Sequence, residues 1–385
     1  MSAPKVAVVT PGSFTIPSKR SSSVERVVEQ VCPLIKHRAN VRIFGRTGKG
    51  LRRFGLIKGV PCERFPAGKG GKYISAVYLR LKTFKPDLIQ VENRPRFAYF
   101  LKKKMPKSRV WLYLHSTTFL SKRHIGTQQL ARSLRAVDRI VVNSAFLKNH
   151  IGQLFPGIKG KISVNHLGVD PDSFTSRWSK KGGQLREEWL RKHRMQGRKI
   201  ILFLGRLIPM KGVHHLLRVV PDVVKEDPSA LFVIVGSAFY GSKRKTPYVR
   251  KLERAAKPYS KHIRFIPYVP YDQVARWFGA ADIAVVPSSA REAFGLVNVE
   301  AMAAGIPVIA TRAGGMKEIV ADGETGYLLD PQMLRSQLKA RLTQLLRDET
   351  LRKRLGTASA ERVREQFTWR HTADRWIKMI ESEVT

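Results

Sequence analysis

Short continuous apolar runs alternate with longer amphipathic stretches along the whole chain. We predict that these runs are buried strands in two sets of six. The first set is Val6–Val9, Val41–Phe44, Leu88–Val91, Val110–Leu114, Ile140–Val142 and Ile162–Val164. The second set is Ile200–Leu204, Leu231–Val235, Ile263–Ile266, Ile283–Val286, Val308–Ala310 and Tyr327–Leu329. Continuous apolar strands separated by helical segments are typical of parallel sheets covered by helices on both faces.

Two sets of strands predict an α/β chain with two doubly wound domains. The length of 385 residues also favours two domains over one. We expect a first domain over residues 1–177 and a second over residues 178–367. The polar stretch Trp178–Arg198 is the expected hinge, with a short amphipathic helix at Gln184–His193. The closing segment, residues 368–385, predicts a helix with a wide apolar face.

Composition indicates a folded, cytoplasmic protein. Apolar residues make up 43% of the chain, which is typical of a globular protein and not of a disordered basic tail. The first ten residues are expected to form a strand and not a signal peptide. No apolar run approaches the roughly 18 residues that a membrane span needs. Two cysteines, Cys32 and Cys62, fit reduced buried thiols and cannot build a disulfide framework or a four-ligand zinc site.

The net charge of +42 is large and uneven. Residues 1–178 carry 34 Lys and Arg against 8 Asp and Glu, whereas residues 179–385 carry 37 against 21. Nucleic acid, an anionic membrane surface or a phosphorylated substrate would each suit such a charge. A generally basic chain with solvated Lys and Arg faces is an equal alternative. We do not expect nucleic acid as the partner, because the chain has no nucleic-acid motif and no aromatic stacking pattern.

Three loops that follow predicted strands of the second set carry glycines and cations. They are Gly205–Gly212, Pro287–Glu292 and Thr311–Glu318. In open α/β sheets, ligands bind at the carboxyl ends of the strands, so these loops are expected at one edge. Glycines, helix N-terminal amides, Arg206 and Lys211 together predict an anion site suited to a diphosphate.

Two carboxylates, Glu292 and Glu300, lie eight positions apart around the glycine that precedes a predicted helix. A helix places them at most ~12 Å apart along its axis. Because a carboxylate accepts hydrogen bonds from paired hydroxyls, Glu300 is a candidate ligand of a ribose and Glu292 of a sugar. The alternative is a solvated loop carboxylate and a helical one engaged in a salt bridge.

These motifs resemble those of the retaining glycosyltransferases of family 4. The resemblance rests on Gly205-Arg206 with Lys211-Gly212, on Glu292-x7-Glu300, and on Gly314-Gly315-x-x-Glu318. It is strongest over residues 195–330. In the first domain, Ile140–Ser144 and Leu167–Asp170 occupy the expected places. Glu92–Pro95 and Gly236–Gly241 resemble the branch that contains spore coat protein SA.

The resemblance implies the GT-B fold, which consists of two facing Rossmann-like domains with parallel sheets and an interdomain cleft. The second domain would hold a nucleotide-sugar donor, a UDP- or GDP-sugar, and the first would take the acceptor. The C-terminal helix, residues 368–385, would cross back to the first domain.

The resemblance also implies a role for each candidate site residue. Arg206 and Lys211 would bind the diphosphate and stabilise the charge that grows on it as the glycosidic bond breaks. Glu292 would hold the sugar, and Glu300 the ribose. His115 would face the donor sugar from the first domain. The implied catalytic set is His115, Arg206, Lys211 and Glu292. The implied donor-binding set is Gly205, Arg206, Lys211, Tyr268, Glu292, Phe294, Gly295, Leu296, Glu300, Ser21 and Ser22.

Transfer in the family retains the configuration of the sugar, without a protein nucleophile or a metal ion. No cofactor is expected, since the nucleotide-sugar is a substrate. Asp170-Pro171-Asp172 is predicted to form a turn and not a magnesium site. The adjacent His214 and His215 do not share a helix face, which argues against a metal site there.

One loop departs from the family pattern. The family usually has a Gly-Gly pair after the first strand, where the backbone approaches the donor phosphate; this chain has Ser21-Ser22. A serine Cβ restricts the backbone at such a position. The neighbouring cations Lys19 and Arg20 are candidates to compensate.

The basic first domain suggests the nature of the acceptor. Lys102–Lys107 follows the apolar Phe97–Leu101, and Leu79–Lys82 interleaves cations with leucines. We expect a sugar, lipid-linked or otherwise anionic acceptor, and peripheral contact with an anionic membrane at its inner face. Location in a spore coat, or ordinary solvated helix faces, are the alternatives.

Sequence reasoning therefore favours a hexosyltransferase of cell-envelope or spore-coat polysaccharide or glycoconjugate synthesis. Two other classes stay open. One is a nucleotide-sugar epimerase or phosphorylase on the same fold. The other is a non-catalytic basic protein with a structural or nucleic-acid-binding role.

Overall fold

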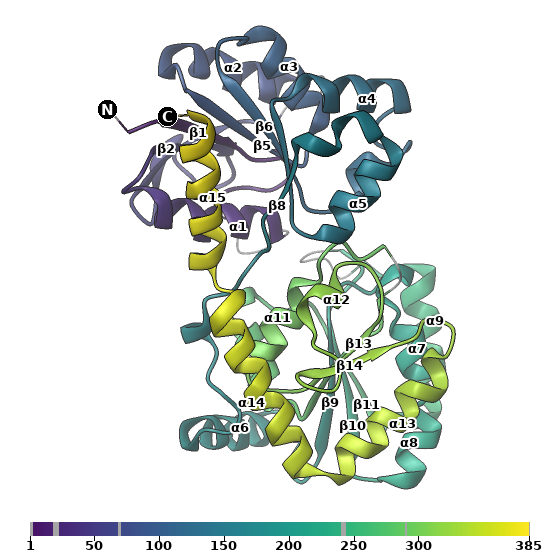
Figure 1. Ribbon diagram of the computed structural model, residues 1–385. Coiled ribbons are helices and arrows are strands. Elements are labelled where there is room, and N and C mark those ends of the chain that lie inside the picture. Colours follow the sequence, from purple (N-terminus) through teal and green to yellow (C-terminus); the bar gives the residue numbers. More distant parts are fainter. Residues whose placement is uncertain (1–2, 18–22, 68–70, 240–243, 289–290, 385) are drawn as a thin grey trace. The chain divides into compact units, whose positions relative to one another are not determined.

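The chain folds into two compact α/β units (Figure 1). The computed structural model describes residues 3–17, 23–67, 71–239, 244–288 and 291–384. One unit comprises Met1–Leu167 together with Trp369–Thr385, and the other comprises Gly168–Thr368. The C-terminal helix therefore belongs to the first unit, although the whole second unit precedes it in the chain.

The first unit is built on an eight-stranded sheet in the order β3-β4-β2-β1-β5-β6-β7-β8. Its strands are β1 (Lys5–Val9), β2 (Asn40–Arg46), β3 (Phe54–Ile57), β4 (Val60–Phe65), β5 (Leu88–Glu92), β6 (Arg109–Leu114), β7 (Arg139–Val142) and β8 (Ile162–Val164). All neighbours are parallel except the β3–β4 pair, which is antiparallel. Each apolar run predicted in this half lies within a strand. The edge strand β3 and its neighbour β4 were not predicted.

Helices cover both faces of the first sheet. They are α1 (Ser23–Ile35), α2 (Lys72–Phe84), α3 (Pro95–Lys104), α4 (Thr127–Ala136), α5 (Ala145–Leu154) and α15 (Trp369–Val384), with short 3-10 turns η1 (Thr117–Leu120) and η2 (Pro156–Lys161). The helices α1 and α15 lie on one face and α2, α3 and α4 on the other (Figure 1). The amphipathic pattern of the C-terminal segment explains its place, because Trp376 and Ile380 of α15 are buried in this unit.

The second unit is built on a six-stranded, fully parallel sheet in the order β11-β10-β9-β12-β13-β14. Its strands are β9 (Lys199–Leu204), β10 (Ala230–Val235), β11 (Ile263–Ile266), β12 (Ile283–Val286), β13 (Val308–Thr311) and β14 (Gly326–Leu329). All six predicted runs are strands. Five of them read as unbroken apolar segments because each contributes side chains to both faces of a covered sheet, whereas the edge strand β11 carries Arg264.

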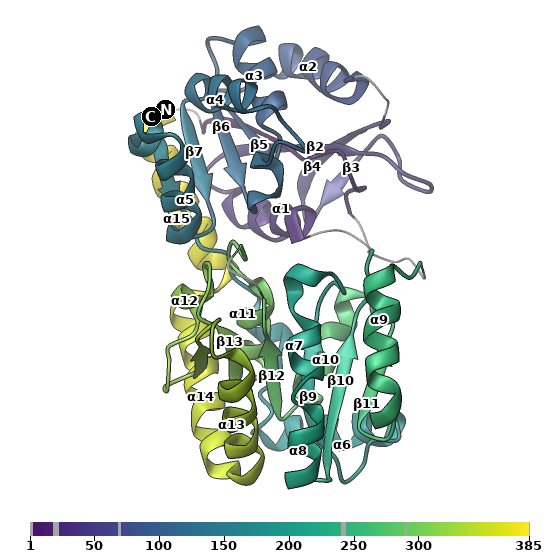
Figure 2. The same cartoon turned by 90° about the vertical axis from the view of Figure 1, so that its right-hand side faces the viewer.

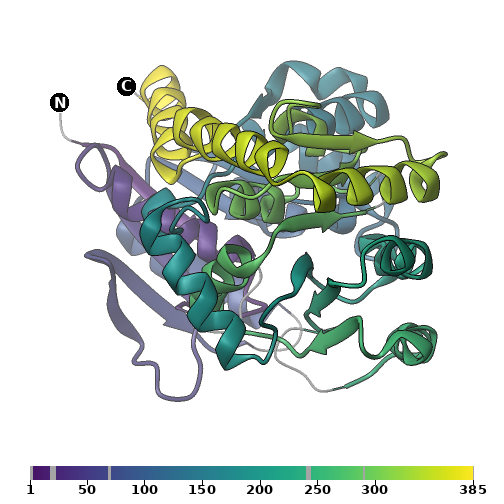
Figure 3. The same cartoon turned by 90° about the horizontal axis from the view of Figure 1, so that it is seen from below.

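Two helical layers enclose the second sheet (Figure 2, Figure 3). The helices are α6 (Lys180–Lys192), α7 (Val213–Leu217), α8 (Val220–Glu226), α9 (Pro247–Ala256), α10 (Val274–Ala280), α11 (Leu296–Ala303), α12 (Met316–Ile319), α13 (Leu334–Arg347) and α14 (Glu349–Gln366), with turns η3 (Pro171–Ser173), η4 (Pro209–Lys211), η5 (Lys257–Tyr259) and η6 (Tyr271–Gln273). Phe203 and Phe232 share one hydrophobic core with α7, α8, α9 and α13.

The expected hinge at Trp178–Arg198 is an integral part of the second unit. Its helix, α6, is longer than predicted and packs on α10, where the Trp189 and Trp277 rings meet edge to face at 5.4 Å. Arg186 of α6 and Arg177 before it both pair with the buried Asp282. The unit boundary accordingly lies between residues 167 and 168, earlier than the boundary after residue 177 that the sequence suggested.

Neither cysteine lies at the surface. Cys32 on α1 and Cys62 on β4 are buried free thiols. Burial raises the pKa of Cys62 to about 11, so this thiol stays protonated at neutral pH. Among the described residues, no helix is both long and apolar enough to cross a membrane.

Candidate functional site

The three loops singled out in the sequence leave the carboxyl ends of neighbouring strands. The strands β9, β12 and β13 are adjacent and parallel, so the loops that follow them lie together at the carboxyl-terminal end of the second sheet, which is called the sheet edge below. Gly205–Lys211 follows β9, residues 287–295 follow β12, and Arg312–Gly315 follows β13. This is the edge at which open α/β sheets bind ligands.

Glycines let these loops cross at backbone distance. A Cβ on Gly212 would lie 1.8 Å from the Pro287 carbonyl oxygen, and one on Gly314 would lie 1.9 Å from that of Glu292. Both glycines also have positive φ, +73° and +56°, a conformation that L side chains disfavour. The Gly315 N–H donates to the Glu292 carbonyl at 3.0 Å. The β12 loop is therefore held between the β9 and β13 loops by main-chain contacts.

Lys211 and Glu292, from two of these loops, form a direct ion pair between Nζ and Oε2. Both side chains are largely buried, with 19% and 14% of their surfaces exposed. Burial alone would raise the pKa of the Glu292 carboxyl. The charge and hydrogen bond of Lys211, with a smaller effect of Arg206, outweigh that and hold this pKa below its usual value. Glu292 is thus a carboxylate at neutral pH.

The helix α11 begins beside this ion pair. Gly295 precedes it with φ +87°, and the Asn298 Nδ2 donates to the Gly295 carbonyl at 2.9 Å. The N–H groups of a first helical turn have no carbonyl in the same helix to bond, so those of Leu296 and Val297 are candidate donors to a ligand, whereas the Asn298 N–H bonds the Gly295 carbonyl at 2.9 Å. Phe294 is buried against Phe367, which anchors the loop. Glu300 is the fifth residue of α11 and is only 5% exposed.

The remaining predicted residues of the second unit lie at the ends of other strands of the same sheet. Gly205 follows β9 and donates its N–H to Val235, the last residue of β10, at 3.0 Å. Arg206 is half-buried in the same turn. Tyr268 follows β11, which is the outermost strand of the sheet and pairs with β10. The predicted Ser21 and Ser22, with Lys19 and Arg20, lie outside the described residues, as does the end of the Gly236–Gly241 motif.

His115 lies in the first unit, directly after β6. Its Nε2 is 2.7 Å from Oε2 of Glu92, the last residue of the neighbouring strand β5, and Glu92 is fully buried. The main chain of His115 is held as well, because its N–H donates to Asn93 Oδ1 at 2.8 Å and its carbonyl accepts from Asn143 Nδ2 at 3.1 Å. Sequence reasoning gave Glu92 no role at this site. The available signal was its position at the end of an apolar run next to the one that precedes His115.

Comparison with known proteins decides the family. The model of glycosyl transferases group 1 matches residues 186–362, and the model of glycosyltransferase family 4 matches residues 24–173. Spore coat protein SA of Bacillus subtilis is 30% identical over 98% of this chain and 99% of its own length. A putative glycosyltransferase of the same organism, YtcC, is 30% identical over 99% of this chain and 93% of its own.

The chain belongs to the family 4 glycosyltransferases. Solved structures agree on the GT-B fold of this glycosyltransferase. The Anabaena protein Alr3699/HepE, solved in complex with UDP-glucose, has a TM-score of 0.78 at 19% identity and covers 98% of this chain and 100% of its own. WaaG, a glycosyltransferase of lipopolysaccharide biosynthesis, has a TM-score of 0.69 at 16% identity, covering 97% of this chain and 99% of its own.

Asp170 and His214, from the two motifs that could suggest a metal site, form hydrogen bonds within the protein. Asp170 caps the turn η3 by accepting from the Asp172 N–H and from Ser173 Oγ. His214 Nδ1 meets the Tyr248 hydroxyl at 2.9 Å. Among the described residues, no three His, Cys, Asp or Glu side chains gather as metal ligands would.

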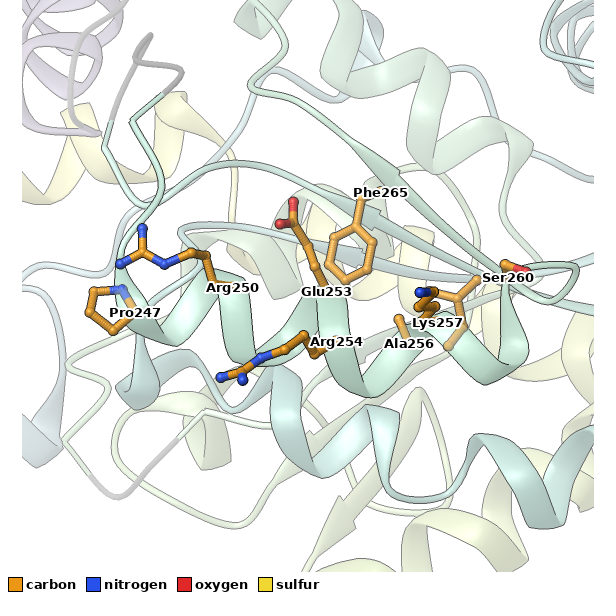
Figure 4. A pocket seen from close by; sticks show the side chains of 9 residues that line it. Pro247, Arg250, Glu253, Arg254, Ala256, Lys257, Ser260 and Phe265 are labelled. Carbon is orange, nitrogen blue, oxygen red and sulfur yellow. The ribbon is translucent and has the colours of Figure 1, made fainter.

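A groove of about 700 Å³ lies along α9 and the edge strand β11 of the glycosyltransferase (Figure 4). Arg250, Glu253 and Arg254 line it, with Phe265 behind them. None of the site residues predicted from the sequence is among those lining it. Size alone therefore does not identify the site, and we assign it to the loops at the sheet edge, where charge and glycine contacts converge.

Proposed function

We propose that this glycosyltransferase takes a nucleotide diphosphate sugar, a UDP- or GDP-sugar, and transfers a hexose to an acceptor hydroxyl with retained configuration. The observation that carries the proposal is the Lys211–Glu292 pair beside the first turn of α11, at the edge formed by β9, β12 and β13. Complexes of the similarly folded HepE with UDP and UDP-glucose support a nucleotide-sugar donor.

In this proposal, Arg206, Lys211 and the N-terminal amides of α11 bind the diphosphate of the donor. A diphosphate carries negative charge that increases as the bond to the sugar breaks, so cations and helix N-terminal donors bind the transition state more strongly than the ground state. Lys211 is already placed at this edge by its contact with Glu292. Removing one such donor typically costs about 10²–10³ in rate.

The carboxylates hold hydroxyls. Glu292 accepts from hydroxyls of the donor sugar, and Glu300 accepts from the ribose diol. Tyr268, at the end of β11, lies near the base, and Phe294, Gly295 and Leu296 shape the phosphate contact. In this proposal His115 keeps the catalytic role that the family resemblance implies.

The transfer step requires no protein nucleophile and no metal ion in this proposal. The bond between the anomeric carbon and the phosphate oxygen breaks, and the acceptor oxygen bonds to the same carbon on the same face. The acceptor proton passes to an oxygen of the leaving phosphate. Lys211 and Arg206 neutralise the charge on that phosphate, which is the role a metal ion fills in other transferases.

Calorimetry against UDP, GDP, ADP and their glucose derivatives tests the donor. We expect one nucleotide to bind, and Lys211→Met to weaken its binding by at least tenfold. Lys225→Met is the matched control, because Lys225 is an exposed lysine of α8. If none of these nucleotides bound, the proposal would fail.

Product analysis tests the reaction. We expect the anomeric proton of the product to show the configuration of the donor, and the rate to survive chelation of divalent metals. Inversion at the anomeric carbon, or loss of activity with chelator that added metal restores, would contradict the mechanism. Release of an isomerised nucleotide-sugar without transfer would instead indicate an epimerase.

For the acceptor, we propose an anionic or lipid-linked sugar presented at the inner membrane face, in envelope or spore-coat glycan synthesis. Residues 30–86 contain fourteen Lys and Arg and a single acid, Glu63. Glu63 is buried and paired with Arg53 and Arg80, which leaves the other twelve cations of this segment without an acid inside it.

Exposed apolar side chains lie within this same cationic segment. Leu56, Leu79 and Phe54 are 68%, 62% and 57% exposed, the largest values for big apolar side chains among the described residues. Phe54 and Leu56 are two apart on β3 and so share one face of the edge strand. Cations beside exposed apolar groups suit an anionic lipid surface, each cation adding about 1 kcal/mol. Lys102, however, is committed to Asp138 and is only partly exposed.

Vesicle sedimentation tests this surface. We expect binding to phosphatidylglycerol vesicles and not to phosphatidylcholine vesicles. The double variant Phe54→Ser with Leu56→Ser should lose most of the binding. Met333→Ser is the control, since Met333 is 55% exposed in the second unit. Equal binding to neutral vesicles, or none to either, would refute the proposal.

A further inference from the structure

A third residue, Gln90, bonds the buried pair of Glu92 and His115. Gln90, two residues before Glu92 on β5, donates from Nε2 to Glu92 Oε1, while Glu92 Oε2 meets His115 Nε2. Both carboxylate oxygens are therefore engaged inside the first unit. His115 itself is 6% exposed at its side chain, so the ring lies within the protein and not on its surface.

A small cavity of about 20 Å³ has His115 among its lining residues. It lies between the sheet and the helices α1 and α15, with Val28 and Cys32 of α1 and Trp376 of α15 in its wall. A volume of this size holds one water molecule, provided that polar groups are present to bond it.

Five polar atoms of the residues lining this cavity are buried and have no hydrogen-bond partner among the described residues. They are Gln90 Oε1, the Tyr113 hydroxyl, His115 Nδ1, Asn143 Oδ1 and Trp376 Nε1. Buried polar atoms are nearly always bonded to protein or to an ordered water, and leaving one unbonded costs about 1–3 kcal/mol. The coincidence of five at one cavity points to a shared partner.

The chemistry of these atoms suits one water molecule. The Trp376 Nε1–H is a donor only, whereas the amide oxygens of Gln90 and Asn143 are acceptors only. His115 Nδ1 is an acceptor when the ring proton sits on Nε2 and is shared with Glu92. The Tyr113 hydroxyl can donate or accept. A water that accepts from Trp376 and from Tyr113 and donates to two of the three acceptors engages four of the five atoms.

We propose that Glu92 and an internal water bound by Trp376 hold the His115 ring from both sides in its Nε2–H tautomer, so that Glu92 is a positioning residue. The proposal rests on the function assigned above to the site that contains His115. Because both ring nitrogens are engaged within the first unit, the imidazole transfers no proton in the reaction. His115 then acts through its main chain and ring edge, which agrees with a step in which the leaving phosphate takes the acceptor proton.

The ring tautomer can be measured directly. We would record long-range proton–nitrogen spectra of the full chain labelled with 15N-histidine and assign His115 by its loss in His115→Gln. We expect a protonated Nε2 and an unprotonated Nδ1. Glu92→Gln keeps an oxygen that accepts from Nε2–H and should preserve this pattern, whereas Glu92→Leu should abolish it. A protonated Nδ1 in the wild type, or an unchanged tautomer in Glu92→Leu, would overturn the proposal.

The water is tested from the other side of the ring. Trp376→Phe removes its donor and should shift the His115 Nδ1 resonance while Nε2 stays protonated. Trp111→Phe is the matched control, because Trp111 also donates to α15, at Glu383, but does not line the cavity. If the Nδ1 resonance were unmoved in Trp376→Phe, the shared water would be refuted. This readout also remains available should Glu92→Leu fail to fold.

Kinetics separate positioning from a purely structural role. We expect Glu92→Leu to lower kcat, by about 10²-fold at most for a misplaced group, with nucleotide binding by calorimetry unchanged. Glu92→Gln should retain most of the turnover. Equal losses of kcat in the two variants would contradict positioning through the hydrogen bond. The nuclear magnetic resonance result does not depend on activity, so an inactive wild type with the expected tautomer would refute the proposed function and leave the tautomer assignment standing.

Discussion

Lys211 and Glu292 are 81 residues apart in the chain, yet their charged ends are in direct contact at the edge of the second sheet. Each is a candidate ligand of the donor, Lys211 for phosphate and Glu292 for sugar. A donor diphosphate must therefore compete with Glu292 for the Lys211 ammonium. In the proposed function, this pair would balance affinity for the nucleotide against alignment of the sugar.

Glu292→Gln should bind nucleoside diphosphate more tightly and turn over more slowly. Loss of the carboxylate charge releases Lys211 to the phosphate, for which we expect a gain of about fivefold in affinity, or ~1 kcal/mol. Turnover should fall by roughly 10²-fold, because an aligned acceptor of the sugar hydroxyls is lost. Calorimetry and initial rates at saturating donor measure the two effects.

Glu300→Ala provides the contrast to that variant. We expect it mainly to weaken nucleotide binding and to leave turnover at saturating donor largely intact. If both variants changed binding and turnover in the same proportion, the division of roles between Glu292 and Glu300 would be wrong.

Gly314→Ala should disrupt the donor site through the backbone of Glu292. A Cβ at Gly314 would lie 1.9 Å from the Glu292 carbonyl oxygen, at a backbone φ of +56°. We expect a loss of nucleotide affinity, together with a destabilisation larger than the ~1–3 kcal/mol typical of backbone strain alone. Gly323→Ala is the matched control, since its φ is +80° and nothing lies within 4 Å of the added Cβ. Similar melting temperatures and affinities in the two variants would argue against the contact.

Asp282→Asn should destabilise the second unit strongly. Asp282 is 2% exposed, accepts from the Ile200 N–H and pairs with Arg177 and Arg186. Breaking a buried charge pair leaves the guanidinium groups uncompensated, which costs about 3–5 kcal/mol. Urea denaturation measures the loss. The exposed pair of Asp222 with Arg335 serves as control, and Asp222→Asn should cost less than ~1 kcal/mol.

Stability should rise with pH between about 4 and 6.5 because of His214. Burial lowers the pKa of His214 to about 4, helped by the nearby charges of His215, Arg218 and Lys251. Below its unfolded value of 6.5 the unfolded chain binds a proton that the folded chain refuses, so the free energy of unfolding falls as pH falls through this window. Burial lowers the pKa of His215 too, which adds in the same direction.

Urea denaturation at pH 4.5 and pH 7 checks this dependence. His214→Gln should reduce the difference between the two values, because Gln does not titrate and can still bond the Tyr248 hydroxyl. The exposed His37 is the control site, and His37→Gln should leave the difference unchanged. An undiminished difference in His214→Gln would contradict the assignment.

The strands that carry the site were predictable, whereas the edge of the first sheet was not. Runs such as Ile283–Val286 lie in a covered parallel sheet, so burial on both faces leaves an unbroken apolar signal. In β3 the apolar Phe54 and Leu56 are exposed, and in β4 Pro61 and Glu63 interrupt the run. Such strands form through pairing with a partner strand, which local composition does not record.

The side-chain contacts of the candidate site residues could not be predicted from the sequence either. The Gly205, Lys211, Glu292 and Gly314 motifs indicated loops at one sheet edge, because strand direction determines where loops emerge. That Lys211 would pair with Glu292, or His115 with Glu92, depends on strand order and on side-chain conformation. The Trp178–Arg198 stretch was misjudged for the same reason: its polar residues include Arg186, whose partner, Asp282, lies almost a hundred positions further along the chain.

The place of α15 has a consequence for synthesis of the protein on the ribosome. Residues 1–167 emerge first, yet the core of their unit lacks Trp376 and Ile380 until the last helix has been made. The second unit, by contrast, is one continuous segment whose two ends are already joined by the Val169 N–H bond to the Phe367 carbonyl. The usual N-terminal-first order of folding is thereby reversed at its final step. The unit that is translated first is the last one able to reach its finished form, and a chain truncated before residue 369 would leave it incomplete.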